Sequence, residues 1–152
     1  MGYALELAQE AGLAGEVPVG AVITDSKTHQ LIATGQNRRE RDCDPTAHAE
    51  IVALRIAAQV LQTRHLHTCT LYVTLEPCPM CAGALIQSRI GCVVYGVDDP
   101  KTGTLRTVAN LPDSPCSYHS FPVWGGIRET ECRQQLQAWF AQKRSPQGSP
   151  EK

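Results

Sequence analysis

Apolar residues recur every three or four positions in three stretches of the chain, and this spacing predicts amphipathic helices. The stretches cover residues 1–14, 47–61 and 129–144. Thr46 is the N-cap that we expect for the second stretch, so that His48 and Glu50 fall in its first turn. A fourth helix is expected over residues 79–88, because a proline suits the first turn of a helix.

Strand-like segments alternate with these helices. Residues 18–24 and 31–35 are β-rich and flank a polar stretch, which together predict a hairpin. Segments 69–75 and 90–97 are rich in β-branched and apolar residues and enclose the expected helix 79–88. We therefore expect these two strands to pair in parallel, with helices covering the sheet, in an α/β fold.

Two segments have no regular hydrophobic pattern. Residues 98–122 are rich in Pro, Gly and Asp and are expected to form a long irregular connection, which is uncommon in proteins unless the loop is functional. Residues 145–152 are expected to be a disordered tail. The length of 152 residues suits one domain, which we place at residues 1–144.

The net charge and the cysteine content of the chain limit which partners and which cellular compartment we expect. The formal net charge of -1 gives no global electrostatic argument for nucleic acid, so any RNA contact must come from local patches. Seven cysteines, mostly in apolar segments, fit a reducing cytosol better than a secreted disulfide framework. The start of the chain lacks the features of a targeting signal, and no apolar run reaches membrane-spanning length. We therefore expect a cytoplasmic protein without membrane attachment.

His48 and the pair Cys78 and Cys81 supply one imidazole and two thiols, which can bind zinc. Structural zinc sites fill all four tetrahedral positions with protein ligands, whereas catalytic sites keep three and leave the fourth for water. We therefore predict one Zn²⁺ per chain in an open site. Glu50 lies two residues after His48 and is the candidate general acid/base. This combination is also the known signature of zinc-dependent nucleobase deaminases, in which the glutamate is not a ligand.

A Cys-x-x-Cys pair alone is ambiguous, because the same spacing serves thioredoxin-like redox pairs and halves of closed zinc sites. A closed four-cysteine site needs a second close pair, which the other cysteines do not supply. A redox pair would explain neither His48 nor Glu50. Several basic residues are, on pattern alone, ordinary solvated side chains: Arg38, Arg39, Arg41, Lys143 and Arg144.

Five segments of the chain carry a resemblance to a known family: residues 16–22, 44–50, 76–84, 88–90 and 99–103. Through them the chain resembles the bacterial tRNA-specific adenosine deaminases, over nearly all of residues 1–144. The resemblance implies a three-layer α/β/α fold of the cytidine-deaminase type, with a mixed five-stranded sheet, and a homodimer. It further implies that the wobble adenosine in the anticodon loop of an arginine tRNA is converted to inosine.

By position, the resemblance places Asn37 and Val17 in the pocket for the base, although Asn37 on pattern alone would be a turn residue. It also places an aromatic pair and a basic pair of the last helix against the anticodon stem-loop: Trp139, Phe140, Lys143 and Arg144. A loop suits such an enzyme, because an unpaired base moves into a pocket at a smaller cost in stacking than a base in a duplex.

Deamination adds water to a ring carbon that bears an amino group and then expels ammonia. Glu50 would take the proton of the water, give it to the ring nitrogen and later protonate the leaving amine. Two other functions remain open: a deaminase of a free base or nucleoside such as guanine, cytosine or cytidine, and a non-catalytic, zinc-stabilised RNA-binding protein. Glu50 argues against the second, because a structural site has no use for a carboxylate beside an open metal position.

Overall fold

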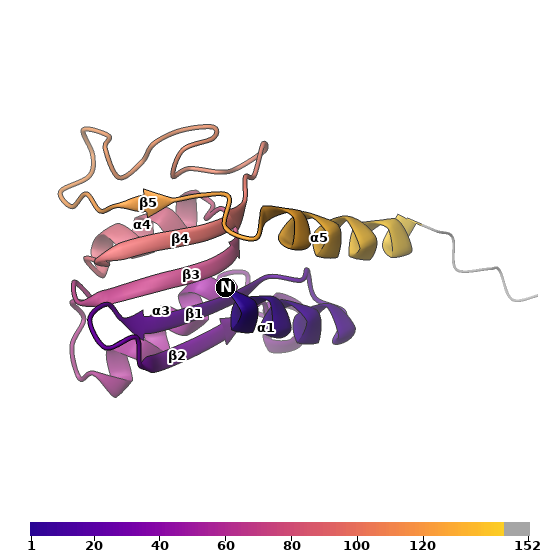
Figure 1. Ribbon diagram of the computed structural model, residues 1–152, viewed down its shortest axis with the longest axis horizontal. Helices are drawn as coiled ribbons and strands as arrows, with labels where there is room; N and C mark the ends of the chain where they lie inside the picture. Colours follow the sequence, from indigo (N-terminus) through magenta and orange to yellow (C-terminus); the bar gives the residue numbers. More distant parts are fainter. Residues whose placement is uncertain (145–152) are drawn as a thin grey trace, which may run out of the picture.

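A mixed five-stranded sheet forms the centre of the molecule (Figure 1). The computed structural model describes residues 1–144. The strands lie in the order β2-β1-β3-β4-β5, with β1 at Gly20–Asp25, β2 at Leu31–Gln36, β3 at Cys69–Leu75, β4 at Cys92–Val97 and β5 at Val123–Trp124. β1 pairs antiparallel with β2 and β3, whereas β4 pairs in parallel with β3 and β5. The predicted hairpin and the predicted parallel pair are therefore confirmed.

Helices cover both faces of this sheet (Figure 1). They are α1 at Gly2–Leu13, α2 at Arg39–Asp42, α3 at Ala49–Val60, α4 at Pro79–Gln87 and α5 at Glu129–Arg144. On one face, α1 contacts β1, β2 and β3, and α5 contacts β4. On the opposite face, α3 contacts the same three strands and also α4. This is the three-layer α/β/α fold that the resemblance implied.

Two glycines let the helices approach the sheet closely. Gly20 of β1 faces α1, where an added Cβ would overlap the carbonyl oxygen of Ala4. Gly35 of β2 faces α3, where an added Cβ would overlap the carbonyl oxygen of Ala49. Ala49 and Ala53 of α3 are fully buried. The first turn of α3, which carries Glu50, is thereby held against the sheet.

The main hydrophobic core lies between the sheet and the layer of α3 and α4. Leu71 and Val73 of β3 and Leu85 of α4 are fully buried there, and Leu54 of α3 is nearly so. Burial of a side chain of this size contributes roughly 1.5–3 kcal/mol to stability. The core therefore fixes α3 and α4 relative to β3, and these three elements supply the candidate site.

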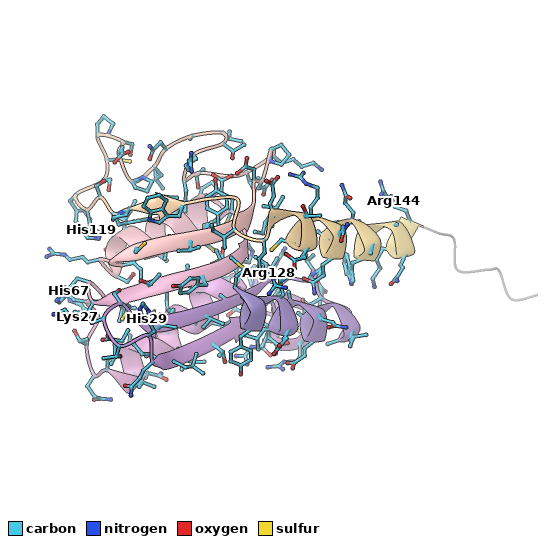
Figure 2. The ribbon with its side chains drawn as sticks, viewed as in Figure 1. Lys27, His29, His67, His119, Arg128 and Arg144 are labelled. Atoms are coloured by element: carbon cyan, nitrogen blue, oxygen red, sulfur yellow. The ribbon has the colours of Figure 1, made fainter. Side chains whose placement is uncertain are left out.

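The hairpin between β1 and β2 closes around Asp25. Its Oδ1 accepts hydrogen bonds from the backbone N–H groups of Lys27 (2.9 Å) and Thr28 (2.8 Å). His29 follows in a left-handed conformation, with φ of 59°. Lys27 and His29 lie at the end of the molecule opposite to Arg144, the last residue of α5 (Figure 2). The polar stretch of the hairpin is therefore remote from the end of α5.

The start of α3 differs from the prediction. The N-cap of α3 is His48 rather than Thr46, so the helix begins two residues later than the predicted cap requires. The Thr46 hydroxyl donates to Asp44 Oδ1 (2.7 Å), which also accepts the Thr46 backbone N–H (2.8 Å). Thr46 therefore closes a turn before the helix, because the nearby carboxylate competes for its hydroxyl. Glu50 lies in the first turn, as predicted.

Two elements have no counterpart in the hydrophobic pattern. α2 spans four residues and buries no side chain, and β5 spans two residues. Both are too short for a hydrophobic period to develop. Residues 98–122 contain no helix or strand, as predicted. The tail predicted at residues 145–152 lies outside the described residues.

No helix within residues 1–144 has both the length and the apolar character that crossing a membrane requires.

Candidate metal centre and catalytic pocket

The three predicted metal ligands meet at the starts of two helices. His48 is the N-cap of α3, Cys78 is the N-cap of α4, and Cys81 lies in the first turn of α4. His48 Nδ1 lies 3.7 Å from Cys78 Sγ and 3.5 Å from Cys81 Sγ. All three ligand atoms lie within 4.8 Å of one another, an arrangement found for no other such group in residues 1–144.

These distances suit zinc. With Zn–N bonds of about 2.0–2.1 Å and Zn–S bonds of about 2.3 Å, tetrahedral angles place the nitrogen roughly 3.6 Å from each sulfur. The separations of 3.7 and 3.5 Å in the structure agree with this value. One imidazole and two thiols fill three positions, so the donor set is that of an open zinc site.

The thiols of Cys78 and Cys81 have pKa values that are shifted in opposite directions. A hydrogen bond from the Cys81 thiol lowers the pKa of Cys78 to about 4, against the effect of burial, and His48 contributes in the same direction. The pKa of Cys81 is raised, because its thiol donates to Cys78 and is buried near Glu50. Cys78 is therefore a thiolate at neutral pH, the form that binds metals. Binding of a metal by both sulfurs must displace the proton of Cys81.

Glu50 is buried beside the three ligands, with 4% of its surface exposed. Burial raises the pKa of its carboxyl group, while its backbone N–H and the charge of His48 oppose this shift. A carboxyl group with a raised pKa can take up and release a proton closer to neutral pH. Glu50 is not part of the group of candidate ligand atoms. Its position therefore suits an acid/base residue rather than a ligand.

A pocket of about 130 Å³ opens over these residues. Val17 and Asn37, which the resemblance places in the pocket for the base, both line it. Asn37 Nδ2 donates a hydrogen bond to the carbonyl oxygen of Val17 (3.3 Å). Asn37 Oδ1 is buried and has no hydrogen-bond partner within residues 1–144. Asn37, a residue of the pocket wall, thus has an unpaired hydrogen-bond acceptor close to the candidate metal site.

Glu76 lines the same pocket, although the sequence analysis gave it no role. Its side chain is buried, and its two oxygens accept hydrogen bonds at 2.8–3.2 Å from four backbone N–H groups: Asp99, Leu105, Arg106 and Thr107. The carboxylate therefore ties the end of β3 to the segment 99–107, which supplies Asp99 and Thr102 to the pocket wall. The available signal was the Glu-Pro-Cys sequence, because a carboxylate directly after a buried strand needs partners.

The residues predicted to contact RNA lie at the end of α5 in two environments. Trp139 packs against α1, where its Nε1 donates to the carbonyl oxygen of Gly12 (3.2 Å). Lys143 Nζ lies 5.3 Å from the centre of the Trp139 ring, and Arg144 Nε donates to the carbonyl oxygen of Phe140 (3.3 Å). Phe140 is 44% exposed. The two aromatic residues therefore turn to different neighbours.

Phe140 lines a groove of about 500 Å³ between α5 and the segment 97–102. This groove and the catalytic pocket have four lining residues in common: Val17, Leu75, Asp99 and Thr102. The pocket and the groove therefore adjoin, and these four side chains form the wall between them. Trp139 does not line this groove, because it faces α1.

Comparison with known proteins identifies the family. The family model for MafB19-like deaminases matches residues 1–117. The tRNA-specific adenosine deaminase of Haemophilus influenzae is 46% identical over 144 residues, which are 95% of this chain and 83% of that protein. The chain belongs to the tRNA-specific adenosine deaminase family. The resemblance and the expectation of a deaminating hydrolase are therefore confirmed.

Solved structures agree with this family. A structure from studies of A-to-I editing by tRNA:A34 deaminases at the wobble position of transfer RNA matches with a TM-score of 0.84 and 40% identity. The match covers 88% of this chain and 95% of that one. A guanine deaminase from Nitrosomonas europaea matches with a TM-score of 0.79 and 27% identity, over 92% of this chain and 82% of that one. The fold is thus shared with a family member and with a deaminase of a free base.

Proposed function

We propose that this protein converts the wobble adenosine of a tRNA to inosine, with an arginine tRNA as the expected substrate. The observation that carries the proposal is Glu50, a buried carboxyl group with a raised pKa beside a donor set for an open zinc site. A structural metal site needs no such acid. The substrate is supported by relatives that are named for tRNA or for A-to-I editing at the wobble position.

In this proposal, His48, Cys78 and Cys81 hold one zinc ion per chain. Bound there, zinc supplies Lewis acidity that lowers the pKa of water to about 7. Glu50 takes a proton from the attacking water and delivers it to the ring nitrogen beside the reacting carbon. It then takes the remaining proton of the added hydroxyl group and delivers it to the amine, which leaves as ammonia. A group that both accepts and donates protons works best with a pKa near the operating pH, and burial moves the pKa of Glu50 in that direction.

Asn37 and Val17 hold the base in the proposed complex. The amide nitrogen of Asn37 is already bonded to the carbonyl oxygen of Val17, so the amide oxygen is left to accept a hydrogen bond from a base N–H. Leaving a buried acceptor without a partner costs about 1–3 kcal/mol. A base without a donor at this position would therefore bind more weakly.

The proposed partner is the anticodon stem-loop, bound through Phe140, Trp139, Lys143 and Arg144. The groove beside Phe140 adjoins the catalytic pocket, so a nucleotide next to the reacting one can occupy it. Local contacts of this kind fit a chain whose net charge is -1. The proposal also includes a homodimer in the cytoplasm. The seven cysteines, all free in the structure, support a reducing compartment.

A deaminase of free guanine is the second candidate, favoured by the likeness to the guanine deaminase of Nitrosomonas europaea. The experiment that separates the two gives the zinc-loaded protein an unmodified tRNA mixture in one reaction and guanine, cytosine or adenosine in others. Sequencing reports inosine, and ammonia release reports turnover of the small substrates. The Glu50→Gln protein controls for contaminating enzymes. Turnover of free guanine without inosine in any tRNA would overturn the proposal.

A further inference from the structure

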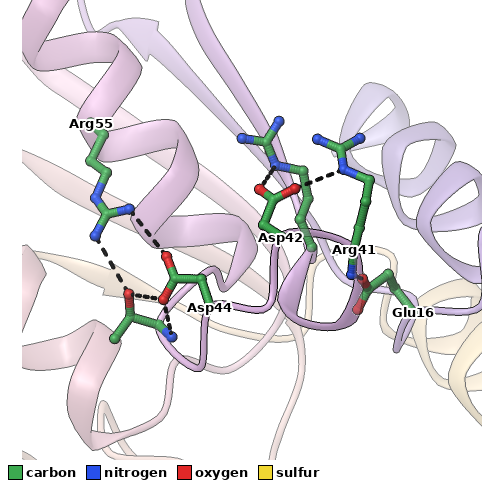
Figure 3. A network of polar contacts seen from close by, with 7 residues as sticks. Glu16, Arg41, Asp42, Asp44 and Arg55 are labelled. Atoms are coloured by element: carbon green, nitrogen blue, oxygen red, sulfur yellow. Dashed lines mark hydrogen bonds and ion pairs between the residues drawn. The ribbon is translucent and has the colours of Figure 1, made fainter.

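Three arginines lie close together in and before α2, and two of them are fixed by one carboxylate (Figure 3). Arg38 Nε lies 3.2 Å from Asp42 Oδ2, and Arg41 Nε lies 2.9 Å from Asp42 Oδ1. Asp42 therefore forms an ion pair with both Arg38 and Arg41. Neither Arg38 nor Arg41 lines the catalytic pocket.

Arg39 differs from both neighbours. Its side chain is exposed, and its guanidinium group has no hydrogen-bond or ion-pair partner within the described part of the chain, residues 1–144. Arg39 lines the catalytic pocket together with Asn37 and His48. Among the described residues that line this pocket, it is the one lysine or arginine. The unpaired guanidinium group of Arg39 thus belongs to the wall of the pocket that the substrate must enter.

The backbone that carries Arg39 is held at several points. Arg41 N–H donates to Glu16 Oε1 (2.8 Å), and Glu16 is buried (Figure 3). Arg38 N–H donates to the carbonyl oxygen of Ala47 (3.0 Å), and the Arg39 carbonyl oxygen accepts from the N–H of Asp44 (3.1 Å). These bonds fasten α2 to the segment that follows α1 and to the turn before His48. The position of Arg39 relative to the pocket is therefore set by the fold.

None of the carboxylates that line the pocket pairs with the guanidinium group of Arg39. Glu76 accepts four backbone N–H groups. Asp99 accepts the backbone N–H groups of Lys101 and Thr102 and the Thr102 hydroxyl. No ion pair joins Arg39 to these acids or to Glu50 among the described residues. No acid within residues 1–144 therefore neutralises the Arg39 guanidinium group, which is free to pair with an anionic group of a ligand.

We propose that Arg39 binds a phosphate group adjacent to the reacting nucleoside, so that the pocket favours a nucleotide within an RNA chain over a free base. This inference rests on the proposed function, because it names the part of the RNA that one further residue recognises. A free base carries no phosphate, whereas each nucleotide of an anticodon loop is flanked by two. Arginine suits the task, because its planar guanidinium group matches the oxygens of a phosphate.

Steady-state kinetics on an anticodon stem-loop test the proposal with Arg39→Ala, Arg39→Lys and the matched control Arg41→Ala. We expect Arg39→Ala to raise KM about tenfold with little change in kcat, because a phosphate is bound equally in the ground state and the transition state. Arg39→Lys should keep part of the affinity, since it retains the charge without the planar fork. Arg41→Ala should behave like the wild type. The slope of log kcat/KM against log salt should become shallower by about 0.7 in Arg39→Ala alone.

A nucleoside monophosphate tells the two flanking phosphates apart. If Arg39 binds the 5′-phosphate of the reacting nucleoside, AMP should inhibit the wild type more strongly than adenosine does, and Arg39→Ala should lose this preference. If the stem-loop KM depends on Arg39 but AMP and adenosine inhibit equally, the bound phosphate is the one on the 3′ side.

The outcomes separate this inference from the proposed function. Equal KM values and equal salt slopes for Arg39→Ala and Arg41→Ala, in proteins that make inosine, would overturn the role of Arg39 alone. Deamination of free guanine by the wild type with no reaction on any RNA would overturn the proposed function instead.

Discussion

Glu76 and Gly103 fit together so closely that a Cβ at position 103 would overlap the carboxylate of Glu76. Gly103 belongs to the segment that Glu76 holds through its four backbone hydrogen bonds. The absence of a side chain at this position therefore lets a buried carboxylate reach the backbone amides of a distant loop.

Gly103→Ala should destabilise the protein by about 1–3 kcal/mol, because the displaced carboxylate would lose hydrogen bonds to backbone amides. Gly83→Ala is the matched control, since an added Cβ at this helical position meets no atom within 4 Å. It should be neutral or stabilise by about 0.5–1 kcal/mol. Urea unfolding of both variants measures the difference. Equal free energies of unfolding for Gly103→Ala and Gly83→Ala would show that the close contact between Glu76 and Gly103 does not contribute to stability.

The wild-type protein should contain about one zinc per chain, and Cys78→Ser or His48→Ala should lose both the metal and thermal stability. Cys92→Ser removes a half-buried thiol outside the ligand group and should keep the zinc. Elemental analysis of the purified proteins provides the measurement. Full zinc content in Cys78→Ser would show that the ligand assignment is wrong.

Glu50→Gln should keep the zinc and the fold but lose turnover by at least the ~10²–10⁴-fold that is typical of one general acid/base. Glutamine has nearly the same shape as glutamate and cannot exchange protons in this way. Single-turnover assays on the stem-loop, combined with zinc analysis of the same sample, test this role. Loss of zinc in this variant would identify Glu50 as a ligand, and retained activity would exclude it as the acid/base.

Acid should weaken the turn before His48 through Asp44. Hydrogen bonds from the Thr46 hydroxyl and backbone N–H lower the pKa of Asp44 in the folded state. A lowered folded-state pKa stabilises the protein above the ordinary aspartate pKa, and this contribution is lost as the pH falls through the lowered value. Asp44→Asn should therefore be less stable than the wild type at pH 7, with a difference that shrinks in this acidic range.

Chemical unfolding across the acidic range checks the prediction for Asp44. Thr46→Val keeps the backbone N–H but removes the hydroxyl donor, so it should show a smaller loss of stability on acidification than the wild type. A difference between Asp44→Asn and the wild type that stays constant with pH would contradict the prediction.

Phe140→Ala and Lys143→Ala should both weaken capture of an anticodon stem-loop, with different responses to salt. The loss in Lys143→Ala should shrink as salt rises, because phosphate contacts are screened, whereas the loss in Phe140→Ala should persist. Gln134→Ala, at an exposed position earlier in α5, is the control. Fluorescence anisotropy with labelled RNA measures binding at several salt concentrations. Wild-type affinity in both variants would exclude this end of α5 from the RNA site.

The long elements of the fold could be predicted from hydrophobic spacing, because helices α1, α3 and α5 each span at least three turns. The three metal ligands were accessible for another reason: their side-chain chemistry is specific, and they are brought together in space by the starts of α3 and α4. The prediction that Thr46 is the N-cap of α3 was wrong, because its hydroxyl group donates to Asp44 instead. Preferences for residue types at helix caps do not include such a competing partner.

Other parts of the site depend on contacts that spacing does not reveal. Glu76 acts on amides more than twenty residues away, so no local pattern indicates its partners. Trp139 and Phe140 are consecutive, and one helical step of about 100° separates an indole on α1 from a phenyl ring in the groove. Arg39 resembles Arg38 and Arg41 in sequence. In the structure it differs from them because it lines the pocket and because the other two pair with Asp42.

The N-cap positions of α3 and α4 are occupied by His48 and Cys78, and neither side chain caps its helix. Serine, threonine, aspartate or asparagine at such positions typically adds about 0.5–2 kcal/mol to stability. A thermostabilisation programme that ranked substitutions by helix capping would therefore select positions 48 and 78 early. Each such replacement would remove a ligand from the metal site, and the stability lost with the zinc would exceed what the cap adds. Engineering of this scaffold should hold both helix starts constant and seek heat resistance elsewhere.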